Sequence, residues 1–591
     1  ETADAQPVRR RRGWGRFALH YLEMVVVMLV GMAVLGGALR LVLAAAGVGY
    51  SMAGFPELTV LEMGLTMAVS MTAWMRFRGH GWAATLEMSA AMIAPAVVVV
   101  VPVWLGGLAA GAAMAVEHVA MFVLMLGVML RRRDEYSAAH GRHGWKPDGR
   151  RIVRALVRGL VLLLAFLLVP AAVYVANSTA YEQSRYTRPD PTPAAAAAMS
   201  APAPVHDPSK PTAVVVVGNG GANVADTLVP YEVLATTGAF NVYTVAPERR
   251  PLPLLGGLDL MPDLDFAQLS ERLGGAAPDI TVVPEMPESG SDAAVVAWLR
   301  DTGSDGLLLG VCTGARLLAD AGLLDGRDAT THWYRIGGLE QRHPEVNWVR
   351  GLRYVDTGDV ITTGGLLSSV DGTLRVIERL LGTDAATAAA DAVGWRTYSR
   401  GTAATLPGSR LAPTDAIVHL LNIGFRANGT TVGVVLTDGV GELELASAFA
   451  PYGEVKSART LAVTDGRDVI RSRHGLTFVP RADLQAAGRV DRLIVPGVDA
   501  AALPDAGVPV TYLHEQPGFA FDGALRDMAA TMDVPTAGWA AKILEYSPAD
   551  LGLSGRGWPW GPVLQVLLLG LAGVAAALGV ERLVRRVRSR S

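Results

Sequence analysis

Cysteine is almost absent from this chain, because its 591 residues include only Cys312. One thiol cannot form an internal disulfide, so the chain must lie where a lone thiol is tolerated. Charged residues are also scarce, at 18%, and the net charge is −3. A nearly neutral chain with no basic stripe lacks the electrostatic footprint that tracks phosphates, so nucleic acid is not expected as a partner.

Apolar residues are abundant instead, at 51%, which is too many for an ordinary soluble protein. Part of the chain is therefore expected in lipid. Six stretches approach the roughly 20 residues that a membrane-spanning helix needs. They lie at about 22–46, 57–76, 84–108, 112–130, 155–176 and 563–580.

Arginine sets the expected orientation, since short cytoplasmic loops retain positive charge. The arginines near the predicted spans are Arg9–Arg12, Arg76, Arg78, Arg131–Arg133, Arg150, Arg151, Arg154, Arg582, Arg585, Arg586 and Arg588. With six crossings, both termini lie in the cytoplasm and residues 177–562 lie outside the cytoplasmic membrane. No cleavable signal peptide is expected, because the first apolar stretch is too long. The low lysine and high arginine content is typical of a high-GC bacterial source.

Shifts in composition predict a multi-domain protein: an α-helical membrane bundle, a three-layer, flavodoxin-like α/β domain and a second, shorter α/β copy. Strand-like runs alternate with helical stretches from residue 212 and again from 431, which indicates a parallel sheet with helices on both faces. The predicted boundaries are a membrane domain 1–176, a Pro/Ala-rich linker 177–211, an α/β domain 212–382, a connector 383–429, a second α/β domain 430–548, a sixth span 563–580 and a basic tail 581–591. The two α/β domains are expected to pair within the chain, and homo-oligomerisation stays open.

The single cysteine lies in "DGLLLGVCTGARLLADAGLL", where a predicted strand turns into a helix. Such a turn presents its side chain at the carboxyl edge of the sheet, beside the positive end of a helix. A cysteine there is expected to have a lowered pKa, with the Thr313 N–H as an oxyanion donor. Cysteine is also among the most buried residue types, so a nucleophile and an inert buried side chain both stay open.

The segments "GVCTGARLLADAGLLDGRDATTHW" and "TTGGLLSSVDG" resemble the ThiJ/PfpI superfamily, within the class I glutamine amidotransferase-like fold. The resemblance covers about 212–382. It is closest to the branch with isonitrile hydratase and the sensor domain of AraC-type regulators. It implies a nucleophile at Cys312, with Thr313 beside it as a site residue and Gly314 as a ligand contact. No helix-turn-helix follows either copy, so a role in transcription is not expected.

The same resemblance implies two partners for the thiol. Asp226, in "ADTLVPYEVL", matches the family's acidic residue, which hydrogen-bonds the cysteine, and His332, in "ATTHW", matches a histidine that some members place nearby. A carboxyl and an imidazole can hold, deprotonate and re-protonate a thiol or a bound water. The alternatives are a helix N-cap at Asp226 and a structural residue at a strand end for His332.

One position departs from the family pattern. The third strand usually leads into a Pro-Gly-Gly turn whose N–H completes the oxyanion hole, but here it leads into Pro284 and Glu285. A carboxylate there would crowd the site, repel a developing anion and raise the thiol's pKa. In the second copy Glu444 takes the acidic position and "VPG" at 495–497 keeps part of the turn, whereas the segment for a cysteine elbow is missing. That copy is expected to be a non-catalytic partner.

Methionine is concentrated in the membrane domain, where fourteen of the nineteen lie before residue 130. Their steps of three or four give each helix a methionine face. The positions are Met24, Met28 and Met32; Met63, Met67, Met71 and Met75; Met88 and Met92; and Met114, His118, Met121, Met125 and Met129. Ordinary packing and a path for a soft ion such as Cu(I) both stay open, with Glu62, Glu87 and Glu117 as nearby ionisable groups.

Three functions remain from the sequence. The first is an extracytoplasmic domain that senses a small molecule or a redox signal through Cys312, with the membrane bundle as anchor or transmitter. The second is a cysteine-dependent hydratase, hydrolase or glyoxalase that acts on a small electrophile. The third is handling of a soft metal ion by the methionine-lined bundle. No cofactor is expected at the α/β site, and a fold resemblance cannot choose among these functions.

Overall fold

The computed structural model describes residues 8–40, 56–104, 110–132, 149–187, 196, 198–199, 203–288, 292–303, 305–401, 403–406, 409–484, 490–497, 507–547 and 551–589. These residues form two compact units. The first, the helical unit, comprises residues 1–167, 411–413 and 573–591, and the second, the α/β unit, comprises 168–410 and 414–572.

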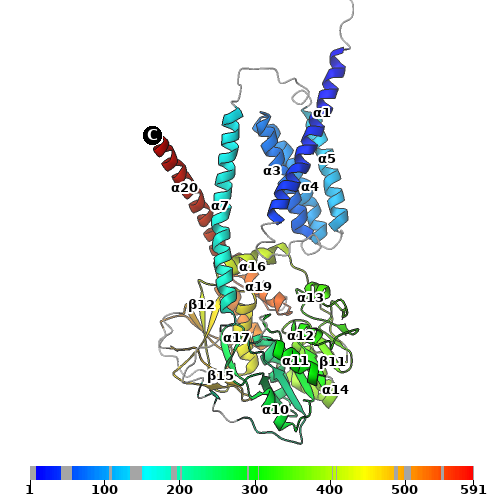
Figure 1. Ribbon diagram of the computed structural model, residues 1–591, viewed down its shortest axis with the longest axis vertical. Helices are drawn as coiled ribbons and strands as arrows, with labels where there is room; N and C mark the ends of the chain where they lie inside the picture. Colours follow the sequence, from blue (N-terminus) through cyan, green and yellow to red (C-terminus); the bar gives the residue numbers. More distant parts are fainter. Residues whose placement is uncertain are drawn as a thin grey trace, which may run out of the picture. The chain divides into compact units, whose positions relative to one another are not determined.

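The helical unit is built on four packed elements, which are drawn in blue in Figure 1. They are α1 (Val8–Gly31), which continues into a π-helical turn (Met32–Gly36), α3 (Pro56–Phe77), α4 (Trp82–Trp104) and α5 (Ala110–Arg131). Helix α3 packs against each of the other three helices. Two further helices, α7 (Gly149–Ser184) and α20 (Trp560–Arg588), contribute residues to both units.

Five of the described helices are long and apolar enough to cross a membrane: His20–Arg40, Trp82–Val100, Met114–Arg131, Val161–Ser184 and Trp560–Val587. The predicted span 57–76 is a helix, α3, but it is not among the five. Three charged residues, Glu57, Glu62 and Arg76, lie in this helix, and each lowers its hydropathy far more than a hydroxyl does. The chain is therefore a candidate multi-pass membrane protein, and its six-crossing orientation stays a prediction.

The predicted start of the linker, at residue 177, is wrong. Residues 177–184 are not extended but form the last two turns of α7, and they are held by the α/β unit. Asn177 donates to the Gly424 carbonyl at 2.7 Å, and Tyr181 is buried against Ile423 and Ala427. The remaining linker residues fall partly outside the described residues.

The first α/β domain has a seven-stranded sheet in the order β10-β11-β7-β6-β1-β2-β5. The strands are β1 (Thr212–Val216), β2 (Asn241–Ala246), β5 (Leu264–Asp265), β6 (Ile280–Val283), β7 (Leu307–Gly310), β10 (Tyr354–Asp356) and β11 (Val360–Thr363). All pair in parallel except β10 with β11. The inner strands β1 and β6 are buried along their whole length, as expected for a sheet covered on both faces.

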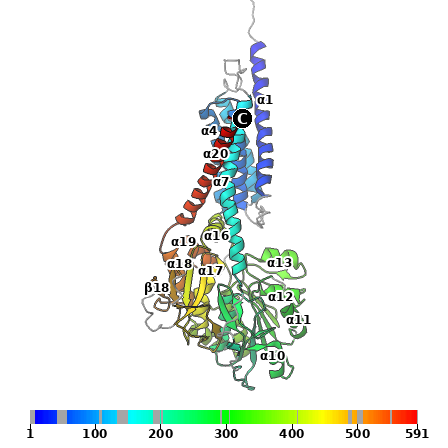
Figure 2. The same cartoon turned by 60° about the vertical axis from the view of Figure 1, so that its left-hand side comes forward.

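Helices cover both faces of this sheet (Figure 2). Helices α9 (Val224–Ala235) and α14 (Ser368–Leu381) pack on each other, and α15 (Thr383–Ala392) packs on both. The other helices are α10 (Phe266–Arg272), α11 (Ala293–Thr302), α12 (Gly314–Asp320) and α13 (Ile336–Arg342), with the short strands β8 (Asp328–Ala329) and β9 (Asn347–Trp348) between α12 and β10. The predicted α/β domain is confirmed, and its sheet is parallel apart from the β10–β11 pair.

The second α/β domain repeats the first in shortened form, with the strand order β16-β13-β12-β17-β18. Its strands are β12 (Thr431–Val435), β13 (Arg459–Thr464), β16 (Ala482–Asp483), β17 (Arg492–Val495) and β18 (Val510–Tyr512). Its helices are α16 (Pro413–Phe425), α17 (Glu442–Glu454), α18 (Ala520–Thr531) and α19 (Val534–Ile543). All its strand pairs are parallel. The predicted second α/β sheet is therefore confirmed.

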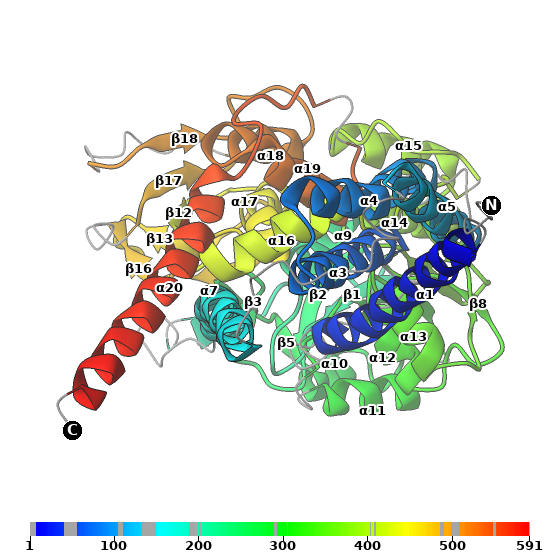
Figure 3. The same cartoon turned by 90° about the horizontal axis from the view of Figure 1, so that it is seen from above.

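The two α/β domains are joined by a shared sheet. Strands β3 (Leu252–Leu254) and β4 (Leu258–Met261) of the first domain meet β14 (Ile470–Arg471) and β15 (Thr477–Val479) of the second, in the order β14-β15-β4-β3. Helices α9 and α17 also pack against each other between the two main sheets (Figure 3). The carboxylate of Asp259, on β4, is 1% exposed and binds the Arg481 guanidinium at 2.6 and 2.7 Å.

We expect Asp259→Ala to destabilise the full chain by about 3 kcal/mol, because it leaves the Arg481 guanidinium without its partner at a buried seam. Denaturant unfolding in detergent, followed by tryptophan fluorescence, measures this loss. Asp438→Ala is the matched control, since the Asp438–Arg467 pair is about half exposed on both sides and is worth under about 1 kcal/mol. Equal losses in the two variants would contradict the role given to the seam.

Candidate ligand site at Cys312

Cys312 lies at the elbow between β7 and α12, with a backbone φ of 53° that non-glycine residues rarely adopt. Three hydrogen bonds hold this conformation. The Cys312 N–H donates to the Gly364 carbonyl at 2.9 Å, its carbonyl accepts from the Thr331 hydroxyl at 2.7 Å, and the Val311 N–H donates to the Val283 carbonyl at 2.9 Å. The predicted strand-turn-helix is therefore present, and its strain is supported from three neighbouring segments.

Gly314 has a structural role at this elbow. A Cβ at this position would lie 1.9 Å from the Val283 carbonyl oxygen, so only glycine lets the start of α12 approach β6 so closely. Gly314 is fully buried and does not line the cavity at Cys312. Thr313 is the residue before α12, and its N–H lies beside the thiol, where it lowers the pKa of Cys312 as the smallest of several effects.

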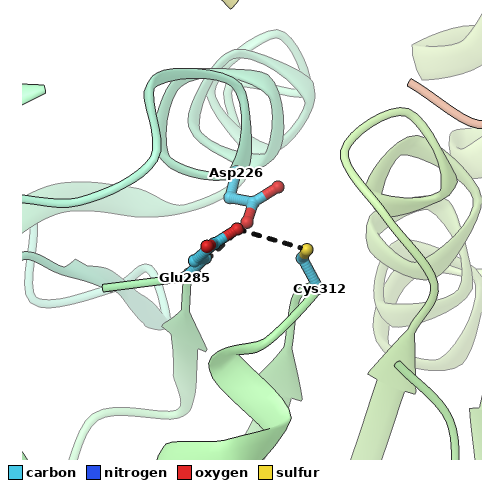
Figure 4. Close-up of side chains that lie close together, drawn as sticks. All are labelled: Asp226, Glu285 and Cys312. Atoms are coloured by element: carbon cyan, nitrogen blue, oxygen red, sulfur yellow. Dashed lines mark hydrogen bonds between the residues drawn. The ribbon is translucent and has the colours of Figure 1, made fainter. Parts of the chain in front are cut away.

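Asp226, Glu285 and Cys312 come together at the carboxyl edge of the sheet, although not in the predicted arrangement (Figure 4). The Cys312 thiol donates to the Glu285 carboxylate, with 3.5 Å between Sγ and Oε2. Asp226 instead accepts from the Glu285 backbone N–H at 3.2 Å. The resemblance-based expectation that Asp226 holds the thiol is therefore not met, because the side chain of Glu285 occupies that place.

Asp226 is not a helix N-cap either. Asn223 caps α9, and its side chain accepts from the Ala225 and Asp226 N–H groups. The Asp226 carboxyl is fully buried, and burial together with the neighbouring Glu285 and Glu454 raises its pKa well above the usual range. Asp226 therefore lies in the first turn of α9, where its carboxyl accepts from the Glu285 N–H and fixes the Glu285 turn.

The pKa of Cys312 is raised, against the expectation from the helix start and in line with the effect expected of Glu285. The side chain is 2% exposed, and burial raises the pKa of the thiol well above its ordinary value, with further increases from Asp226, Glu285 and Glu454. The N–H at the start of α12 lowers the pKa of the thiol, but burial and the surrounding acids raise it by more. The cysteine is therefore a neutral thiol at neutral pH, and the thiolate that a nucleophile needs is disfavoured.

His332 reaches the same cavity but serves the domain interface. Its Nε2 donates to the Ile543 carbonyl of α19 at 2.8 Å, while Nδ1 accepts from the Tyr334 N–H at 3.3 Å. Burial lowers the pKa of His332 to about 4, so the imidazole is neutral. Because both of its nitrogens are engaged, His332 makes no hydrogen bond to Cys312. The alternative of a structural residue therefore describes His332 best.

The space in front of Cys312 is a cavity of about 140 Å³ that both domains and the end of α7 enclose. Its lining residues carry both signs of charge: Arg185, Glu285, Cys312, His332, Tyr334, Arg335, Leu366, His419, Glu454, Lys456 and Trp539. Glu454, from the end of α17, accepts from the Asn223 side chain at 2.6 Å and is partly buried in this setting, where burial and Glu285 raise its pKa to about 7. The cavity is therefore a polar chamber between the two domains.

Sequence reasoning missed the half of this chamber that the second domain and α7 supply. Arg185 follows the last residue of α7, while Glu454 and Lys456 flank the end of α17. No motif marks them, because they reach the site only through the pairing of the two domains.

The second domain carries a corresponding edge. Val432 pairs with Arg492 as Ala213 pairs with Ile280, and Leu493 pairs with Val510 as Thr281 pairs with Leu308. Counting along these registers places Gly497 where Glu285 lies and His514 where Cys312 lies. Glu444 is the third residue of α17, as Asp226 is of α9.

The sequence suggested that the elbow segment of the second domain is missing. The structure shows that it is shortened. Its strand, β18, is present, but α18 follows directly, with no counterpart of α12 or β11 among the described residues 510–531. A cavity of about 310 Å³ lies at this edge, lined by Glu444, Gly497, His514 and residues of the first domain such as Glu232. His514 takes the position of the cysteine there, so the two edges differ in chemistry.

Two trios of side chains have ligand atoms within 4.8 Å of one another: Asp226, Glu285 and Cys312, and Glu232, Glu442 and His474. The first contains an acid and a thiol whose pKa values are both raised, which favours protonated groups over metal ligands. In the second, the Glu442 carboxylate accepts from His474 Nδ1 at 2.8 Å, and Glu232 accepts from the Leu443 N–H at 2.5 Å. These hydrogen bonds explain why the three side chains of the second trio lie close together.

Comparison with known proteins identifies the first domain. The DJ-1/PfpI family matches residues 212–379, and over that range the chain belongs to this family. An uncharacterized protein in the cpoL 5'region of Streptomyces lividans is 31% identical over 144 residues, which are 23% of this chain and 96% of that protein. Isonitrile hydratase of Pseudomonas putida is 28% identical over 167 residues, which are 27% of this chain and 67% of the hydratase.

The HTH-type transcriptional regulator CdhR of Pseudomonas aeruginosa is 40% identical over 90 residues, 15% of this chain. The match spans only 26% of the regulator's own length. Among solved structures, a cysteine-to-alanine mutant of a DJ-1 superfamily protein from Salmonella typhimurium is 26% identical, with a TM-score of 0.28 over 32% of this chain and 99% of that one. The predicted resemblance is confirmed for residues 212–379.

We expect Glu285→Gln to make Cys312 more reactive. The substitution keeps an oxygen acceptor near the thiol and removes a charge that raises its pKa, so the thiolate fraction at pH 8 increases several-fold. The rate of alkylation by iodoacetamide, followed by mass spectrometry of the intact full chain, measures this change. Glu288→Gln is the control, because Glu288 lies on the same loop but pairs with Arg342. Slower or unchanged alkylation of Glu285→Gln would contradict the assigned geometry.

Glu454 makes stability depend on pH. Its pKa of about 7 in the folded chain exceeds the ordinary 4.5, so its contribution is fully present below pH 4.5 and is lost as pH rises through 7. Between pH 5 and 8, Glu454→Gln should lose about 2 kcal/mol less unfolding free energy than the wild type. Denaturant titrations at both pH values measure it, with exposed Glu340→Gln as control. Parallel losses in wild type and Glu454→Gln would show that Glu454 is ionised throughout.

Proposed function

We propose that this chain is a membrane sensor whose paired α/β domains bind a small molecule in the chamber at Cys312. The observation that carries the proposal is the composition of the chamber wall, which comes from the first domain, the second domain and the end of α7. A ligand that contacts all three would change the free energy of their arrangement, which is the requirement for a signal. The predicted placement of residues 177–562 outside the cytoplasmic membrane belongs to this proposal.

Binding is favoured over catalysis by the surroundings of the thiol. Catalysis by cysteine needs an accessible thiolate and donors for an oxyanion. Here burial and three acids raise the pKa of Cys312, and the Glu285 carboxylate lies where an anion would develop. The same protonated thiol disfavours redox sensing, because oxidation proceeds through the thiolate. A cysteine-dependent hydratase or hydrolase is the alternative.

A small carboxylate fits the chamber best. Arg335 is exposed at the chamber, where its guanidinium lies 5.7 Å from the Tyr334 ring centroid, and no described residue provides it with an ion pair. The two other cations differ, since Lys456 and Arg185 are both paired with Glu182 of α7. A volume of about 140 Å³ has room for roughly ten water-sized groups, which limits the ligand to about ten heavy atoms.

The link to α7 is direct. Glu182 lies in the last turn of that helix and binds Lys456 of the second domain, while Arg185 follows the same helix into the chamber. A carboxylate drawn to Arg335 competes with Glu182 for these neighbouring cations. The proposed signal is therefore a change in how the second domain holds the end of α7.

The test is ligand-dependent stabilisation of the full chain in detergent. Acetate, pyruvate and glycine are the probes, with acetamide as a neutral control of matched size. Binding raises Tm through linkage, and we expect a rise with at least one carboxylate that is lost in Arg335→Gln and kept in Arg350→Gln, whose exposed arginine pairs with Glu340. A rise that persists in Arg335→Gln, an equal rise with acetamide, or no rise with any carboxylate would contradict the proposal.

An enzymatic assay addresses the alternative. Isonitrile hydratase is among the relatives, so cyclohexyl isocyanide is a suitable electrophile. The proposal predicts no consumption that depends on Cys312 when wild type and Cys312→Ala are compared. Turnover in the wild type that Cys312→Ala abolishes would show that the chain is a cysteine-dependent enzyme and would overturn the proposal of a sensor.

A further inference from the structure

Methionine fills the core of the helical unit. Ten methionines there are at most 1% exposed and form one buried cluster with Phe17, Ala68 and Ala84. They come from α1, α3, α4 and α5, which pack side by side (Figure 1). The ten are Met24, Met28, Met67, Met71, Met75, Met88, Met92, Met121, Met125 and Met129. The stripes of the four helices therefore face one another.

Packing alone does not explain this choice of residue. The same helices contain many leucines and valines, and these are placed on the outside, where Leu22, Leu65, Leu86 and Val119 are each about 60% exposed. A core selected only for packing uses leucine, isoleucine and valine, because methionine is flexible and specifies a core poorly. The helical unit reverses that order, so the thioether itself is the feature that distinguishes its interior.

A carboxylate lies at one end of the methionine cluster. Glu117 is 0% exposed, and neither of its carboxylate oxygens has a hydrogen-bond partner among the described residues. It precedes Met121 by four residues and so shares its helix face. A Cβ built on Gly64 would lie 3.3 Å from Glu117 Oε1 and 3.7 Å from the Met92 carbonyl, so the carboxylate sits where α3, α4 and α5 meet.

Imidazoles lie toward the other end. Along α3 the methionines run from Met67 to Met75, away from Gly64, and His80 follows. His80 is 2% exposed, and its ring lies 5.5 Å from the ring of His20, which precedes Met24 on α1. The interior is therefore a series of thioethers between a buried carboxylate and a pair of histidines.

We propose that this methionine core binds Cu(I). Thioethers are soft, neutral ligands that select Cu(I), and imidazole also suits copper. A monovalent cation held by neutral ligands in a low-dielectric interior leaves one positive charge, which the Glu117 carboxylate neutralises. The ion enters and leaves as Cu(I), so no electron is transferred. The inference concerns the helical unit alone and does not depend on the function proposed for the α/β unit.

The experiment measures retained metal on the purified full chain in detergent. The protein is incubated anaerobically with Cu(I) in a competing chelator, desalted and assayed by mass spectrometry of the metal, with Ag(I) as a redox-inert second probe and Mn²⁺ as the hard control. We expect at least about one equivalent of Cu(I) or Ag(I) and no Mn²⁺, because Mn²⁺ prefers carboxylate, carbonyl and water oxygens to thioethers.

Variants assign the site. Met67→Leu, Met92→Leu and Met121→Leu together keep an apolar core of similar volume and remove the thioethers nearest Glu117, and we expect retention to fall at least about tenfold. Met528→Leu is the matched control, since Met528 is fully buried in the α/β unit, and it should retain the wild-type amount. Glu117→Gln should weaken retention, because the buried charge loses its counterion.

Retention in the triple variant equal to wild type would overturn the proposal, as would a wild-type chain that holds no Cu(I) or Ag(I) against the chelator. If the triple variant fails to fold, judged by circular dichroism and gel filtration, the three single variants replace it. Unchanged retention in all three then overturns the site. Equal losses in Met528→Leu would show a general effect of lost methionine and would also overturn it.

Discussion

The pairing of the two α/β domains is the constraint on which the Cys312 site depends. Strands β4 and β15 join the domains edge to edge, and the buried Asp259–Arg481 pair fixes that seam. Helices α9 and α17 then pack together, so that Glu454 reaches the Asn223 cap of α9 and Glu232 reaches the first turn of α17. Each domain thus supplies a glutamate to the edge of the other, and neither cavity is lined by one domain alone.

This pairing explains why Cys312 is a protonated thiol although its backbone turn is typical of a nucleophile. The backbone at Cys312 has the strained turn, the close glycine and the helix start that suit a nucleophile. The second domain adds Glu454 and Lys456 to the surroundings, and Glu285 takes the place of a glycine turn. The same backbone therefore presents a protonated thiol to a charged chamber, and recognition by Arg335 becomes the more consistent chemistry.

Local patterns predicted the fold well. The strand runs, the elbow at Cys312 and the acidic position of Glu444 depend on residues near in sequence, and the structure contains them. The helix at 57–76 was predicted, but it contains Glu57, Glu62 and Arg76 and is not among the helices that are apolar enough to cross a membrane. Residues 177–184 were predicted as linker because "NSTAYEQS" is polar, whereas contacts with the α/β unit hold them in α7.

The site could be predicted only in part, because half of its wall comes from distant residues. Cys312, Asp226 and Glu285 follow three strand ends of one sheet, and proximity of parallel strand ends brings them together. The rise in the pKa of Cys312 was expected from Glu285 alone, whereas Glu454 and the burial beneath the second domain add to it and have no signature near residue 312. His332 was placed at the site by resemblance, yet its bond to the Ile543 carbonyl could be seen only once α19 was positioned.

The most direct measurement is the ultraviolet absorbance of the thiolate during a pH titration of the full chain, with Cys312→Ser as the blank. The chain has a single cysteine, so the difference signal belongs to one residue. The account predicts no thiolate at neutral pH and ionisation above the ordinary value of about 8.5. A thiolate that is already formed below pH 7 would contradict it and would restore Cys312 as a nucleophile.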